Sequence, residues 1–109
     1  MDVQEIVRKA VEMNASDIFV VAGSSIAYKV KNKVIRLEDE ILMPEHCRIL
    51  VDDLYRCANN RSMHRLEEKG DDDFSFAVPG LSRFRVSAYK QRGALSAVIR
   101  VITFELPEP

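Results

Sequence analysis

The stretch Ser82–Ile102, SRFRVSAYKQRGALSAVIRVI, determines the predicted fold. Both of its halves alternate between apolar and polar residues, which is the period of a half-buried β-strand, and Arg92-Gly93 lies between them as a turn signal. If this dipeptide is a two-residue loop, Gln91 pairs with Ala94 and the register of the hairpin is set. One face is then wholly apolar and predicts the core of the domain, formed by Phe84, Val86, Ala88, Leu95, Ala97, Ile99 and Val101.

The opposite face of this hairpin gathers three arginines. In the predicted register Arg85 lies directly opposite Arg100, and Arg83 lies on the same side two residues before Arg85. Like charges placed opposite each other destabilise a sheet, so this arrangement needs an explanation. Three remain open: solvation of the guanidinium groups, pairing with the carboxylates of Asp71–Asp73, or binding of an anion, above all phosphate.

The rest of the chain supplies further strands and three helices. Apolar residues at three- and four-residue spacing predict a first helix from Val3, with Asp2 and Glu5 as a capping box. Pro44 begins the clearest helix, which carries one continuous apolar stripe. Further segments are predicted as strands at 18–22, 26–30, 34–37 and from 74, as a short helix at 61–69, and as the hairpin strands 82–91 and 94–103.

These elements follow in the order αβββααβββ and predict an α+β fold. Strands joined by short hairpins must be antiparallel. We therefore expect one antiparallel sheet of about six strands, with the helices packed on one of its faces.

Composition limits the class of protein. The chain has 109 residues, enough for one domain, and a formal net charge of -1, which argues against a nucleic-acid binder with a basic surface. Two cysteines, Cys47 and Cys57, are too few for a disulfide scaffold. No apolar run is long enough for a signal peptide or a membrane span. These features predict a soluble domain of a reducing, cytoplasmic compartment.

Motifs for catalysis and metal binding are missing from the sequence. There is no G-x-x-x-x-G-K-[S/T] loop, so this fragment is expected neither to cradle nor to hydrolyse ATP. The histidines His46 and His64 and the two cysteines lack the spacing of zinc ligands. The run Asp71–Asp73 is interpreted as a charged turn before a strand rather than as a cation site.

Four short motifs occur in a recognisable order: ASDI at 15–18, DDDFSF at 71–76, SRFRVSAYKQRG at 82–93 and VIRVI at 98–102. Together they resemble the N-terminal domain of the PilT-type type IV pilus retraction ATPases, the twitching-motility motors of the wider secretion ATPase superfamily. The resemblance extends from Met1 to about Ile102. It selects the same hairpin face as the register argument.

The resemblance implies a PAS-like domain over residues 1–103, with 104–109 as the start of a linker to a RecA-like ATPase domain. In that family, arginines of the last hairpin reach the phosphates of nucleotide held by the following domain. Arg85 and Arg100 match two of these, and Arg83 matches the first arginine of the R-F-R pair. ATP and Mg²⁺ would then belong to the full-length protein, and this fragment would need no cofactor.

The resemblance also implies a cellular setting. The partners would be the chain's own ATPase domain, neighbouring subunits of a homohexamer and the inner-membrane pilus machinery, without nucleic acid or direct membrane insertion. The location would be cytoplasmic, peripheral to the inner membrane. Two alternatives stay open: a free-standing PAS-like sensor or interaction module, and the equivalent domain of a pilus assembly or type II secretion ATPase.

The chain departs from the family pattern at four positions. The family usually has histidine, proline, arginine and glycine where this sequence has Phe19, Ile26, Lys29 and Asn32. Asparagine also adopts positive φ, so the last change is mild. The changes at positions 19 and 29 put in doubt any role that the first sheet region has in relatives.

Overall fold

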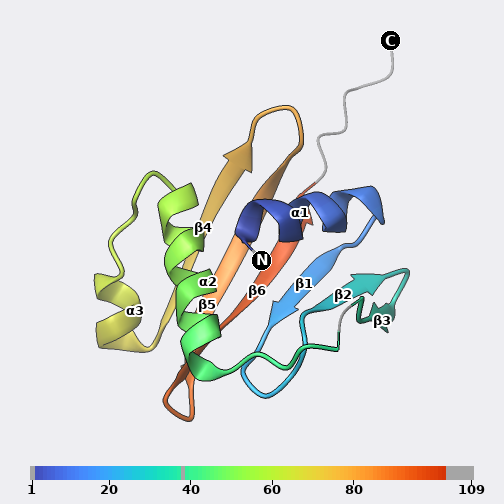
Figure 1. Cartoon of the computed structure of the whole chain (residues 1–109). Coiled ribbons are helices and arrows are strands. Elements are labelled where there is room, and N and C mark those ends of the chain that lie inside the picture. Colours follow the sequence, from blue (N-terminus) through green and yellow to red (C-terminus); the bar gives the residue numbers. More distant parts are fainter. Residues whose placement is uncertain (1, 38, 103–109) are drawn as a thin grey trace.

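A computed structural model describes residues 2–37 and 39–102 of the chain. The predicted element order is confirmed (Figure 1). The elements are α1 Val3–Glu12, β1 Asp17–Val20, β2 Ala27–Val30, β3 Lys33–Ile35, α2 Pro44–Cys57, α3 His64–Lys69, β4 Asp71–Val78, β5 Ser82–Gln91 and β6 Ala94–Ile102. The end of the last predicted strand and the predicted linker lie outside the described residues.

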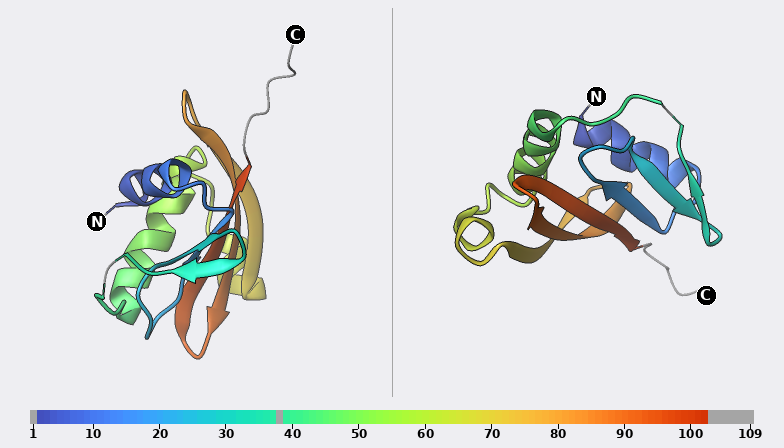
Figure 2. Two further views of the ribbon diagram at one scale, coloured as in Figure 1. Left: turned by 90° about the vertical axis from the view of Figure 1, so that its right-hand side faces the viewer. Right: turned by 90° about the horizontal axis from the view of Figure 1, so that it is seen from below.

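The strands form one six-stranded antiparallel sheet with the order β3-β2-β1-β6-β5-β4. Its central pair joins β1 to β6, so the first strand of the chain lies beside the last. Helices α1 and α2 cover one face of this sheet, and α3 lies near β4 (Figure 2). No helix in the described part of the chain covers the other face, and that face carries the three arginines. None of the described helices is long and apolar enough to cross a membrane.

The predicted register of the β5–β6 hairpin is confirmed, because Gln91 pairs with Ala94 and Arg85 with Arg100. Both turn residues have positive φ, 51° for Arg92 and 79° for Gly93. Two successive positive φ angles characterise the primed turns that match the twist of a β-hairpin. The turn geometry therefore fixes which side chains of the hairpin share a face.

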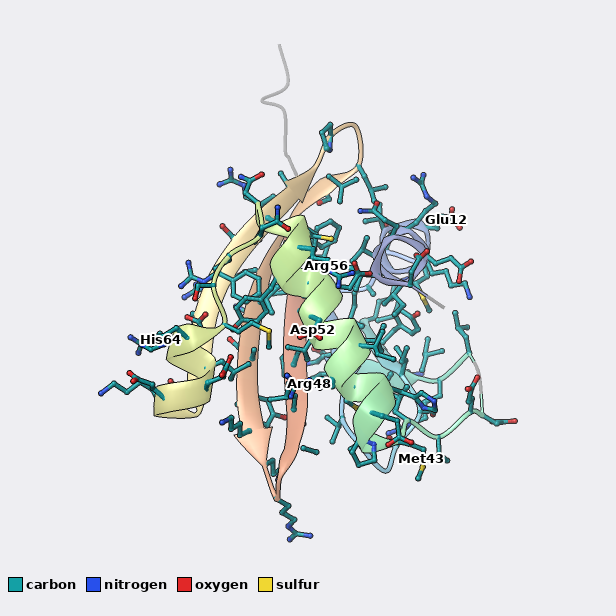
Figure 3. The ribbon with its side chains drawn as sticks, turned by 60° about the vertical axis from the view of Figure 1, so that its left-hand side comes forward. Glu12, Met43, Arg48, Asp52, Arg56 and His64 are labelled. Carbon is teal, nitrogen blue, oxygen red and sulfur yellow. The ribbon has the colours of Figure 1, made fainter. Side chains whose placement is uncertain are left out.

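Helix α2 separates a buried stripe from a charged, outward side. Pro44 occupies the first turn, as predicted, and the buried residues recur at helical spacing. Arg48, Asp52 and Arg56 follow one another at four-residue spacing along the helix (Figure 3), which places them on one side of it. The buried stripe packs on the sheet and consists of Cys47, Leu50, Val51, Leu54 and Tyr55.

The interpretation of Asp71–Asp73 as a charged turn is wrong. These residues are the first three of β4, which alternates between exposed and buried positions from its first residue. Asp72 therefore points inward and is only 2% exposed. The preceding helix is also shorter than predicted, since it begins at His64 rather than at Arg61, and Arg61 is left in the connection where it can reach Asp72.

A buried charge cluster makes the inward position of Asp72 possible. Arg61 donates two hydrogen bonds to the carboxylate, from Nε and Nη2, each 3.0 Å long. Tyr55 donates a third from its hydroxyl at 2.9 Å. The Arg61 guanidinium holds the pKa of Asp72 below its usual value, against the opposing effect of burial. These hydrogen bonds hold the connection between α2 and α3 against β4.

The lowered pKa of Asp72 predicts an acid-dependent loss of stability. A carboxyl whose pKa is depressed by folding stabilises the native state above its unfolded pKa of about 4, and this contribution disappears as pH falls through the folded pKa. Urea unfolding at pH 6 and pH 3 measures the difference. In an Asp72→Asn variant the free energy of unfolding should change less between these pH values. An equal change in both proteins would contradict the prediction.

Candidate phosphate-binding face

The structure places all three predicted site residues on the face of the sheet that no described helix covers. Arg85 of β5 and Arg100 of β6 are direct partners in the ladder, and Arg83 is paired with Ile102 one step along the same side. All three arginines are exposed. The sheet therefore presents two guanidinium groups side by side, with a third next to them.

The arginine pair belongs to a row of side chains that runs across the sheet. From β2 to β4 the row consists of Lys29, Asp17, Arg100, Arg85 and Ser75. Asp17 is the single acidic residue of this row. Its Oδ1 atom lies 3.8 Å from Nε of Arg100. Positive charge is therefore concentrated at Arg100 and Arg85.

Carboxylates of β4 do not neutralise the arginines. Among the described residues, no carboxylate lies within 4.0 Å of the guanidinium nitrogens of Arg83 or Arg85. Asp72 is buried with Arg61, and Asp73 accepts a hydrogen bond of 2.7 Å from the hydroxyl of Ser87. The explanation by pairing with Asp71–Asp73 is therefore wrong for these arginines, while the explanations by solvation and by an anion remain.

Two shallow hollows meet at Arg85. One of about 300 Å³ contains Arg83 and Arg85 in its lining, together with residues of β4. The other, of about 210 Å³, is lined by Arg85, Ser87, Val98 and Arg100. The first hollow is at the lower limit of the clefts that enclose whole ligands, roughly 300 to 1,000 Å³, and the second is below it. Each hollow is thus lined by two arginines, and Arg85 is common to both.

Asp17 is the contributor that sequence reasoning missed. The sequence shows it only as part of the ASDI motif, and its contact with Arg100 depends on the pairing of β1 with β6. These strands are far apart in the chain, and no short turn dictates their pairing. The motif itself was the available signal, since an acidic residue at the start of a buried strand needs a cationic or polar neighbour.

The positions that depart from the family pattern lie in or next to β1 and β2. Lys29 is the ladder partner of Asp17, so a cation is retained there. Phe19 is half-buried in the next row on the same face. Ile26 is buried near the start of β2, and Asn32 has a φ of 65° in the turn between β2 and β3. Asparagine thus serves where glycine is usual in the family.

Other reactive groups do not form a second centre in the described chain. Residues 2–37 and 39–102 contain no group of three or more potential metal ligands. Cys47 and Cys57 are free thiols, and burial raises the pKa of both. A raised pKa keeps a thiol protonated and therefore a poor nucleophile. The arginine-bearing face remains the strongest candidate for a functional site.

The sequence comparison and the structure comparison both find type IV pilus ATPases, and the match is to their N-terminal portion. The chain is 31% identical over 107 residues to the type IV pilus ATPase PilU of Pseudomonas aeruginosa. It is 33% identical over 102 residues to the type IV pilus retraction ATPase PilT of the same organism. The resemblance indicated by the four motifs is confirmed. No protein-family model matches the chain.

Solved structures give the same result for the fold. The crystal structure of the pilus retraction motor PilT with bound ADP matches 99% of this chain with a TM-score of 0.84 and 32% identity. The ATPase DotB of Legionella pneumophila matches 96% of the chain with a TM-score of 0.74 and 23% identity. The predicted α+β fold is confirmed, and it is the fold of the PilT N-terminal domain.

The chain corresponds to a minor part of each relative. It spans 27% of the length of PilU and 29% of the length of PilT. It likewise covers 31% of the PilT structure and 29% of the DotB structure. The similarity therefore concerns one domain of these ATPases.

Proposed function

We propose that this domain supplies arginines to the phosphates of a nucleotide held by an ATPase domain, within a longer pilus motor protein. The observation that carries the proposal is the pair Arg85 and Arg100, which lie opposite each other on adjacent strands. Two cations in this position repel each other, and a bound anion would relieve that repulsion. The PilT relative was solved with bound ADP, which is an anion of the required kind.

The chemistry of the guanidinium group fits this role. Its planar set of donors matches phosphate oxygens and remains charged at every physiological pH. Arginine placed against a transferring phosphoryl group stabilises the negative charge of the transition state. The exposure of Arg85 and Arg100 lets them act on a nucleotide bound elsewhere. The full-length protein would bind ATP with Mg²⁺ on its ATPase domain, and Arg83 would support the pair from the neighbouring hollow.

The proposed setting follows that of the relatives. We infer a homohexameric ring in which this domain contacts its own ATPase domain and that of a neighbour, and in which nucleotide state changes these contacts. The ring would act in the cytoplasm against the inner-membrane pilus machinery. Movement of the ring would then depend on whether phosphate is present between the arginine face and the ATPase domain.

The alternative of a PAS-like sensor predicts a ligand between the sheet and the helices. That space is filled by buried side chains of α1, α2 and the sheet. A hollow of about 390 Å³ lies instead among residues 21–23, 42–44, 91, 92, 94 and 96 at one end of the sheet. The packing thus favours the phosphate-contacting role over the sensor. A role in pilus assembly or secretion would use the same arginine chemistry.

Binding of pyrophosphate to the isolated domain tests the arginine face. We expect pyrophosphate at tens of millimolar to raise the melting temperature by several degrees, because a ligand that binds only the native state stabilises it by mass action. Arg85→Ala and Arg100→Ala should remove most of this shift. Arg92→Ala, which removes a charge from the turn of the same hairpin, should retain it. Absence of a shift in the wild type, or an equal shift in the Arg85→Ala variant, would overturn the proposal.

A further inference from the structure

Asp17 is held in a fixed position beside the proposed phosphate site. The backbone N–H of Ser16 donates to the carbonyl of Lys29 at 2.8 Å, and the N–H of Val101 donates to the carbonyl of Ser16 at 2.9 Å. These bonds tie the start of β1 to β2 on one side and to β6 on the other. The side chain of Asp17 is only 14% exposed. Its carboxylate thus has little freedom to move.

The contact between Asp17 and Arg100 involves one edge of the guanidinium group. The atom of Arg100 that approaches the carboxylate is Nε, at 3.8 Å, and the arginine side chain remains 70% exposed. A charge-assisted hydrogen bond between nitrogen and oxygen is shorter, about 2.7 to 2.9 Å. The contact is therefore a loose ion pair, which leaves the terminal Nη donors available to a second anion.

Arg85 lacks such a partner among the described residues, although it faces Arg100 across the ladder. Like charges at directly paired positions repel each other. Asp17 lies on the far side of Arg100 from Arg85. Its negative charge attracts the Nε edge of Arg100 and so opposes free rotation of that side chain.

We propose that Asp17 is a positioning residue, which holds Arg100 by its Nε edge and thereby directs the Nη donors toward the phosphate shared with Arg85. This inference rests on the proposed function of the arginine pair. Holding the side chain before binding reduces the conformational entropy lost when the anion binds. We expect this gain to outweigh the repulsion between the carboxylate and the anion, because Arg100 lies between Asp17 and Arg85 in the row.

Two variants that each lose one negative charge test this inference, because pyrophosphate binding should weaken in one of them and not in the other. Asp17→Asn should weaken pyrophosphate binding about two- to fivefold, the range that exposed ion pairs provide. Asp73→Asn is the matched control, since Asp73 lies on the same face and lines the hollow of Arg83 and Arg85. This control removes the same charge without breaking an ion pair to an arginine. It should therefore leave pyrophosphate binding unchanged or make it tighter. Asp17→Glu should restore part of the lost affinity.

Nuclear magnetic resonance relaxation of the arginine Nε–H groups gives a measurement without any anion. In the wild type, Arg100 should be more ordered than Arg83, and Asp17→Asn should lower its order to the level of Arg83. Unchanged order in the variant would overturn the inference, and so would binding to Asp17→Asn as tight as to the wild type. If the variant fails to fold, equal order of Arg100 and Arg83 in the wild type is the contradicting result.

The two proposals fail in different ways. Wild-type binding that disappears in Arg85→Ala but keeps its full affinity in Asp17→Asn would support the arginine face and reject the role of Asp17. Absence of pyrophosphate binding in the wild type would reject the preformed anion site. The relaxation measurement would still decide whether Asp17 positions Arg100.

Discussion

Arg85→Ala in the full-length motor should lower ATP turnover roughly a hundredfold to a thousandfold, the order of loss seen when one donor to a transition-state charge is removed. Arg85 contributes to both shallow hollows of the arginine face, so its loss affects the whole site. Arg100→Ala should act in the same direction. Steady-state turnover at saturating ATP measures the effect on the transition state, and nucleotide affinity measures the ground-state part.

The control for this experiment removes an equal charge from the same hairpin. Arg92 lies in the turn between β5 and β6 and is exposed, away from the paired arginines. Arg92→Ala should therefore retain turnover within about twofold of the wild type, as expected for a surface change away from the site. Unchanged turnover together with unchanged nucleotide affinity in both Arg85→Ala and Arg100→Ala would rule out the phosphate-contacting role.

The hairpin was predictable from sequence because its information is local. Arg92-Gly93 specifies the turn, the turn sets the register, and the register places Arg85 opposite Arg100. None of these three steps depends on residues that are distant in the sequence. Alternation alone identifies this face, and the resemblance to pilus motors implies a role for it.

The remaining part of the site depends on pairing between distant strands. The partnership of Asp17 with Arg100 requires β1 to lie beside β6, and the sequence between them offers several other orders of strands. Register arguments apply within a hairpin and do not choose its neighbours. Sequence reasoning therefore found the cations of the row and missed its acidic member.

The misinterpretation of Asp71–Asp73 has a related physical cause. Charged residues are almost never fully buried unless they are paired, so three aspartates in succession indicate an exposed turn. The strand period nevertheless places the middle one inward. Its partners Tyr55 and Arg61 come from α2 and the segment after it, and only the tertiary fold brings them together.

Asp72→Ala should be the most destabilising change in this cluster, lowering the free energy of unfolding by about 2 to 4 kcal/mol. Removing one partner of a buried ion pair is strongly unfavourable, and the buried hydroxyl of Tyr55 also loses its acceptor. Arg61 moderates the loss, because its side chain is 40% exposed and water can solvate it. Urea unfolding at neutral pH gives the value.

The neighbouring aspartate supplies the control for that measurement. Asp71 has a side chain that is 71% exposed and lies 4.0 Å from Arg65, so Asp71→Ala should cost less than about 0.5 kcal/mol. Asp72→Asn should fall between the two variants, since an amide oxygen can still accept from Tyr55 but carries no charge for Arg61. A loss below about 1 kcal/mol in Asp72→Ala would mean that the cluster adds little to stability. The inward position of Asp72 would then follow from Phe74 and Phe76 alone. These two buried side chains lie on the same face of β4 and would suffice to fix which face of the strand meets the core.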